Sequence, residues 1–192
     1  MNIFTEAAMT RPLFEEPSDA IERTDPWSGP QGFMIGGMAL PTKAELGQQY
    51  FDAATILIEA IRRGECEDYR LANPALFLYR HWIELTIKSL IGSGVKGHDL
   101  GDLAEMFEST VTERFGEEVP SWITARLKEM AAIDPGSTAF RYGENYDRQR
   151  KADVSVDGEI YVDLGHLQAV MAALNAAFGH MGAAVRTGKG AL

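Results

Sequence analysis

Hydrophobic residues recur along this chain with the period of an amphipathic helix, interrupted by stretches rich in glycine and proline. From Leu46 to Ile61 they fall at steps of three and four residues, and the same spacing returns in four later segments. Such steps place apolar side chains on one face of a helix. We therefore expect helices over residues 42–63, 73–91, 99–115 and 120–133, and a last helix that opens at residue 163.

Local start and stop signals support these bounds. Thr42 and Glu45 form a capping box, in which each side chain binds a free backbone N–H of the other residue. Asn73-Pro74 predicts the start of the second helix, and Asp99 is a capping residue for the third. Because the connections are short, we expect an all-α fold, an up-and-down bundle of about five helices.

Residues 153–163 break the helical period. Their sequence, DVSVDGEIYVD, alternates apolar and polar residues around Asp157-Gly158. Asp-Gly favours the left-handed backbone of a tight hairpin turn. We expect a small β-hairpin or extended loop there, before the last helix.

The first 40 residues differ from the rest, because Pro12, Pro17, Pro26 and Pro30 interrupt any regular period. We expect a flexible or extended N-terminal arm over residues 1–40, which either packs on its own domain or docks on a partner. The helical bundle then spans residues 41–181, and residues 182–192 form a C-terminal tail.

The composition and net charge of the chain limit the classes of function that we expect. The 192 residues carry a net charge of −10, which argues against broad binding to a phosphate backbone. The best candidate for a local basic patch is residues 141–151, with Arg141, Arg148, Arg150 and Lys151. The single cysteine, Cys66, cannot form an internal disulfide, no segment has the length of a membrane span, and no secretory signal is evident. We therefore expect a cytoplasmic protein that does not contact a membrane.

A polar stripe runs along the second predicted helix through His81, Glu84 and Lys88, with Arg80 beside it. Glu84 and Lys88 have the spacing of a favourable ion pair within one helix. Two interpretations stay open, a solvated helix face and a functional groove. Metal binding is not expected, because His81 and Glu84 occur once and in the reverse order of the di-iron pattern.

The segment GSGVKGHD, residues 92–99, has the glycine spacing of a phosphate-binding loop. After Gly97 it has His98 and Asp99 instead of the lysine and hydroxyl residue that such a loop needs there, and it follows a helix rather than a strand. We interpret its glycines as the end of the second helix and expect no cofactor.

A second polar cluster lies in residues 134–147, where Asp134, Ser137, Arg141 and Tyr142 follow the fourth helix. The planar fork of Arg141 suits a carboxylate or a phosphate. It either ties this loop to a carboxylate such as Glu84 or takes part in catalysis.

Taken together, YRHWIELTIKSLI (79–91), GHDLGDL (97–103) and STAFRYGEN (137–145), followed by a last helix, resemble HEPN-type helical domains. The resemblance covers about residues 42–180 and extends to the abortive-infection and toxin–antitoxin members. It implies a helical bundle that often pairs as a homodimer, and in many members a metal-independent RNase with an Arg-x4–6-His motif.

This chain departs from that motif, because none of its four histidines has an arginine five to seven positions upstream. We therefore expect a non-catalytic interaction or dimerisation module, with a protein partner and a role in phage defence or a toxin–antitoxin pair. The alternative is a metal-independent RNase or nucleotide-handling enzyme, although the net charge does not favour RNA or a nucleotide. The candidate catalytic residues are His98, Arg141, Lys88 and Glu84, and the candidate binding residues are Arg80, His81, Asp99, Ser137 and Tyr142.

Overall fold

A computed structural model describes residues 40–187 except 93, 148–149 and 157, together with the isolated positions 12, 14, 33 and 35. The chain divides into two units, residues 1–40 and 41–192, and the description below concerns the second. The N-terminal arm predicted for residues 1–40 thus lies almost entirely outside the described residues.

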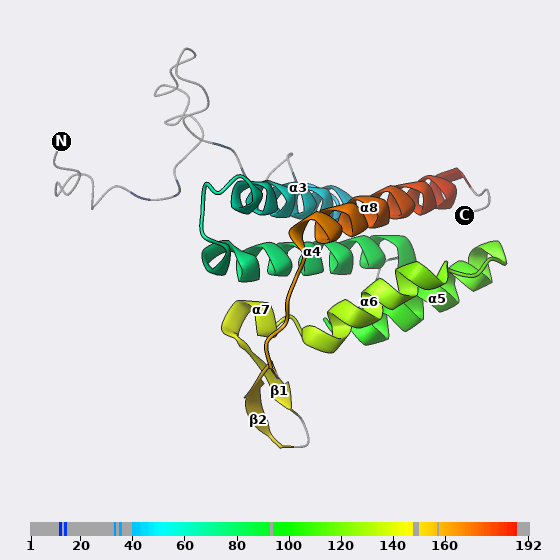
Figure 1. Ribbon diagram of the computed structural model, residues 1–192. Coiled ribbons are helices and arrows are strands. Elements are labelled where there is room, and N and C mark those ends of the chain that lie inside the picture. Colours follow the sequence, from blue (N-terminus) through cyan, green and yellow to red (C-terminus); the bar gives the residue numbers. More distant parts are fainter. Residues whose placement is uncertain are drawn as a thin grey trace, which may run out of the picture. The chain divides into compact units, whose positions relative to one another are not determined.

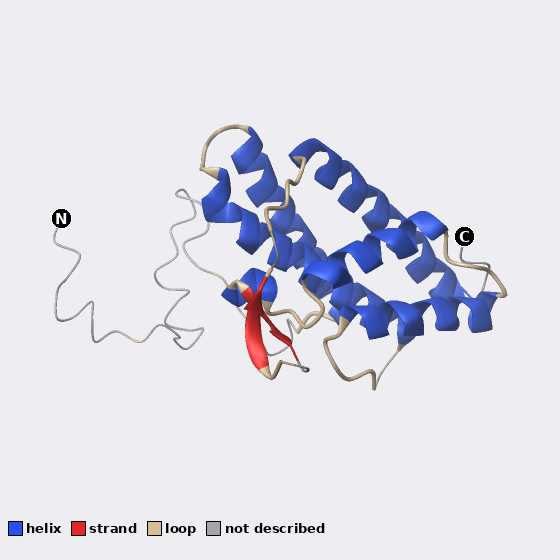
Figure 2. Cartoon of the chain, turned by 60° about the horizontal axis from the view of Figure 1, so that its bottom comes forward, coloured by secondary structure: helices blue, strands red, loops and turns tan. Residues whose placement is uncertain are grey.

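The second unit is mostly helical, as the hydrophobic pattern predicts. Its elements, labelled as in Figure 1, are α3 (Lys43–Arg62), α4 (Asp68–Ile91), α5 (Leu100–Phe115), α6 (Ser121–Ile133), α7 (Ala139–Tyr142), β1 (Glu144–Asp147), β2 (Ala152–Ser155) and α8 (Leu164–Thr187). Figure 2 shows the two strands as a short hairpin beside the helices. The predicted all-α bundle with a small hairpin before its last helix is therefore confirmed.

Helix α4 is central to this unit. It pairs antiparallel with α3 and also packs against α5, α7 and α8 (Figure 1). The indole of Trp82 contacts the rings of Phe51 on α3 and Phe178 on α8, at centroid distances of 4.8 and 5.8 Å, and Phe178 reaches Phe107 on α5 at 5.8 Å. A helix that is apolar on two faces must be covered on both of them. These aromatic contacts link α4 to α3 and α8, and α8 in turn to α5.

The capping signals work as expected. Thr42 accepts from the backbone N–H of Glu45, whose carboxylate accepts from the N–H of Thr42 in return. Asp99 accepts from the N–H groups of Gly101 and Asp102, at 2.9 and 3.2 Å. Gly116 ends α5 with φ at 68°, a left-handed conformation that glycine adopts without steric cost.

The predicted start of the second helix is wrong. Helix α4 begins at Asp68, and Pro74 lies inside it. Proline removes the N–H that would bind the carbonyl of Arg70, but Arg70, Asn73 and Pro74 are all exposed, so water can satisfy that carbonyl. The predicted tail is also partly wrong, because α8 continues past residue 181 to Thr187.

The hairpin forms at a different place from the one predicted. Strands β1 and β2 pair antiparallel with Glu144 opposite Ser155 and Asp147 opposite Ala152, so the turn precedes Ala152 rather than lying at Gly158. Asn145 explains the shift, since its amide donates to the carbonyl of Ile133 at 2.8 Å and anchors β1 to the end of α6. That tertiary contact outweighs the local preference of Asp-Gly for a turn.

Candidate functional site

Three charged residues of α4 stack on successive turns of its buried side. Arg80, Glu84 and Lys88 follow one another at four-residue steps, which places them in one row along the helix. Their exposed fractions are 0%, 1% and 7%. The polar stripe therefore exists, but it is buried rather than a solvated helix face.

The guanidinium of Arg80 ties three segments together. Its Nη1 donates to Oε2 of Glu84 at 2.8 Å, and its Nε donates to the backbone carbonyl of Asp134 at 2.9 Å. Its Nη2 donates to the carbonyls of Pro135 and His98, at 2.7 and 2.5 Å. One side chain of α4 thus holds both the loop before α5 and the loop after α6.

The carboxylate of Glu84 is the common acceptor of this network. Besides Arg80, it accepts from Nζ of Lys88 at 2.8 Å and from Nδ1 of His98 at 2.7 Å. Burial by itself raises the pKa of Glu84, but the hydrogen bonds from Lys88, His98 and Arg80 outweigh burial, so its pKa is lowered. Glu84 is therefore ionised at neutral pH, although it is almost fully buried.

His98 is the exposed member of the network, with 68% of its side chain accessible. An ionised carboxylate can only accept, so Nδ1 of His98 carries the proton that points to Glu84. In the neutral ring this leaves Nε2 as an acceptor. A histidine oriented in this way by a carboxylate could serve as a base.

Asp134 also belongs to this network, because it contacts Arg80. Its Oδ1 accepts from the N–H groups of Thr138 and Ala139 at 2.7 and 3.0 Å, which holds the start of α7. Its Oδ2 makes no hydrogen bond and lies 3.5 Å from Nε of Arg80. The buried charges are thus two cations, Arg80 and Lys88, and two anions, Glu84 and Asp134.

The predicted clamp between Arg141 and Glu84 is wrong. Arg141 is exposed, and its Nε donates to the carbonyl of Ser137 in its own loop at 2.6 Å. Arg80 takes the role that was assigned to Arg141, because its position on α4 points it into the bundle between two loops. The spacing of Arg80, Glu84 and Lys88 on a helix apolar on two faces could have signalled this, since such a helix leaves little exposed surface for charges.

The remaining candidates are separated. Asp99 caps α5, and Ser137 is buried with a left-handed backbone, φ 64°. Tyr142 is 69% exposed. His81 packs edge-on against Tyr50 at a ring distance of 4.6 Å. Burial lowers the pKa of His81, so its ring is neutral near pH 7.

The structure brings His98, Glu84 and Lys88 together and leaves Arg141 elsewhere. Glu84 and Lys88 are buried and paired with each other, which is the arrangement expected of a structural network. Among the described residues, no three histidine, cysteine, aspartate or glutamate side chains are placed to hold a metal ion. None of the helices in the described ranges is long and apolar enough to cross a membrane.

Comparison with known proteins adds no further constraint. No family model, no curated protein and no solved structure matches this chain.

Proposed function

We propose that this protein is a non-catalytic helical interaction module of the HEPN type, which pairs with a second copy of itself through the outer face of α8. The proposal rests on the composition of that face. From Leu164 to Val185 the helix contains no aspartate, glutamate, lysine or arginine. The outer face of a helix at a protein surface is normally rich in charged residues, particularly in a chain of which 24% is charged.

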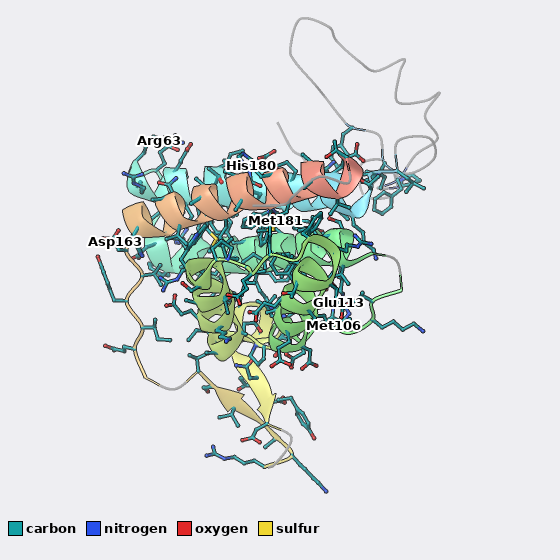
Figure 3. All side chains as sticks on the ribbon, turned by 90° about the vertical axis from the view of Figure 1, so that its right-hand side faces the viewer. Arg63, Met106, Glu113, Asp163, His180 and Met181 are labelled. Atoms are coloured by element: carbon teal, nitrogen blue, oxygen red, sulfur yellow. The ribbon has the colours of Figure 1, made fainter. Side chains whose placement is uncertain are left out.

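The buried and exposed sides of α8 are clearly distinct. Met171, Leu174, Phe178, Met181 and Ala184 face the core. In Figure 3, Met181 points into the bundle, whereas His180 lies on the outer side of the helix. The outer face is therefore not covered by the other helices of this unit.

The outer face has the spacing of a helix–helix seam. Exposed small residues recur along this face, with alternating steps of four and three residues: Gly165, Ala169, Ala172, Ala176, Gly179 and Ala183. This is the heptad pattern along which two helices pack, and glycine and alanine let the two backbones approach closely.

Charge favours a second copy as the occupant. Two molecules that each carry a net charge of −10 repel one another over most of their surfaces. Pairing α8 with α8 about a two-fold axis brings together two faces without carboxylates or ammonium groups, so this contact avoids like-charge repulsion. The HEPN resemblance independently implies a homodimer.

The test is the mass of the protein in solution, measured by light scattering on a sizing column. We expect a dimer for the native chain and a monomer for Ala172→Glu, which places two carboxylates in the seam. Ala132→Glu is the matched control, an exposed alanine on α6, and should leave the dimer intact. A monomeric native protein would refute the proposal, as would an Ala172→Glu variant that remains dimeric.

One observation favours the alternative of a metal-independent RNase, namely the exposed His98 held by the buried Glu84. In that case His98 would act as the base on a ribose hydroxyl. Purified protein in EDTA should then cleave RNA, and His98→Gln should not. Absence of cleavage by the native protein would remove this alternative and leave the interaction module.

A further inference from the structure

The described arginines at the surface differ in whether a carboxylate pairs with them. Four of them pair with a neighbouring carboxylate: Arg63 with Glu59 and Glu65, Arg70 with Glu67, Arg126 with Glu129, and Arg150 with Asp147. Arg62 instead donates to the side chain of Gln168, and Arg114 donates to the carbonyl of Leu90. No carboxylate of the described residues lies within ion-pair distance of Arg141. Among the described arginines, only Arg141 both lacks a carboxylate partner and lies over aromatic rings.

The guanidinium of Arg141 is held in place. Its Nε donates to the carbonyl of Ser137 at 2.6 Å. Its Cζ lies over the ring of Tyr142 at 4.9 Å and over the ring of Phe77 on α4 at 5.7 Å. Cation–π contacts of this kind orient an arginine while leaving its terminal nitrogens able to donate.

The backbone below Arg141 is strained. Ser137, whose carbonyl accepts from Arg141, has φ at 64° and is 6% exposed. Left-handed backbone is unfavourable for a residue other than glycine and is found preferentially where a binding or catalytic group must be positioned. Asp134 keeps this turn in place through its hydrogen bonds to the N–H groups of Thr138 and Ala139.

We propose that Phe77, Ser137, Arg141 and Tyr142 form a binding site for a carboxylate attached to an apolar or aromatic group. We call these four residues the Arg141 site. The two Nη groups of an arginine match the two oxygens of a carboxylate in a bidentate pair. The exposed ring of Tyr142 provides an apolar surface for the group that carries the carboxylate, and the ring of Phe77 supports the guanidinium from α4.

Charge selects a carboxylate over a phosphate monoester. Within the buried network, Arg80 and Lys88 are already balanced by Glu84 and Asp134, and the ring of His81, which stacks on Phe77 at 5.8 Å, is neutral near pH 7. Arg141 therefore supplies one positive charge. A carboxylate matches one charge, whereas a phosphate monoester carries nearly two at neutral pH.

The test uses the full chain labelled with 15N and follows the Nε–H signal of Arg141 by NMR. The probes are benzoate, N-acetylphenylalanine, benzamide and phenyl phosphate. We expect benzoate or N-acetylphenylalanine to shift this signal to saturation and the uncharged benzamide to leave it in place. If benzoate binds more tightly, the natural ligand is a small aromatic acid; if N-acetylphenylalanine does, it is the carboxyl end of a peptide.

Variants isolate the guanidinium, and their affinities are measured by titration calorimetry with the better probe. Arg141→Gln should abolish binding, and Arg141→Lys should weaken it about tenfold, because an ammonium group cannot form the paired hydrogen bonds. Tyr142→Leu removes one ring from an exposed position and should weaken binding without unfolding the protein. The matched control is Arg70→Gln, because Arg70 also lies over a tyrosine ring, that of Tyr69 at 5.9 Å, but is paired with Glu67.

Four results would overturn the proposal. They are no shift with either carboxylate, a shift of the same size with benzamide, tighter binding of phenyl phosphate than of benzoate, and equal loss of binding in Arg70→Gln and Arg141→Gln. None of these results depends on whether α8 forms a dimer.

Discussion

Replacing Arg80 by methionine should remove a large share of the stability of the helical unit. Methionine has a similar length and fills the space apolarly, so the change mainly deletes the five-donor guanidinium. The carboxylate of Glu84 loses one of its three partners, and Asp134 loses its neighbouring cation. The buried charges, two cations and two anions in the native protein, become one cation and two anions.

The size of the effect follows from what stays buried. Removing one partner of a buried ion pair costs about 3–5 kcal/mol, because the remaining charge is left uncompensated. The carbonyls of His98, Asp134 and Pro135 also lose a donor, which adds to this cost. We expect a loss of at least about 4 kcal/mol, a large share of the roughly 5–15 kcal/mol that stabilises a typical domain.

Urea unfolding monitored by circular dichroism measures this free energy by linear extrapolation. Arg70→Met is the control, because it breaks an exposed ion pair with Glu67 and should cost at most about 1 kcal/mol. Arg80→Lys keeps the charge but loses most of the hydrogen bonds, so it should lie between the two. A loss below about 1 kcal/mol for Arg80→Met would show that the network does not hold the two loops, and the structural interpretation would be wrong.

Two further predictions concern single features. The pKa of Glu84 is lowered in the folded state, so the folded protein binds a proton at Glu84 less readily than the unfolded chain does. The stabilising contribution of Glu84 is therefore fully present above its unfolded pKa, near 4.3, and is lost as the pH falls through the lower folded pKa. Urea titrations from pH 6 to pH 3 should show stability falling less steeply with acid in Glu84→Gln than in the native protein, and parallel curves would contradict this assignment. Asp99→Ala removes the cap of α5 and should cost about 1 kcal/mol, measured as a lower urea midpoint at constant slope; Asp99→Asn should retain most of the stability, and equal losses in both variants would point away from capping.

Sequence reasoning identified the helices because their signals are local. The capping box of Thr42 and Glu45 and the cap at Asp99 act within three residues, and the hydrophobic period acts within one helix. Such signals are the same in the isolated segment and in the folded chain. They can therefore be interpreted without knowledge of the tertiary packing. The start of α4 was predicted at the wrong residue. Asn73-Pro74 is a typical start signal, but an exposed segment of a helix can also contain it in its interior.

The candidate site was only partly predictable. From the sequence, Glu84, Lys88, His98 and Arg141 were candidates for one site; the structure joins the first three and leaves Arg141 out. The sequence favoured Arg141 as the clamp because it lies in a polar loop, and the signal for Arg80, its spacing from Glu84 and Lys88 on a helix apolar on two faces, was not used.

The sequence by itself determined the helical class of this protein, most of its helix ends and the presence of a hairpin before the last helix. Only the tertiary structure decided that the polar stripe of α4 is buried, that Arg80 joins two loops, and that β1 pairs with β2. The physical reason is separation along the chain. Arg80 reaches carbonyls 54 and 55 residues away, and contacts over such distances depend on how the helices pack rather than on any local preference.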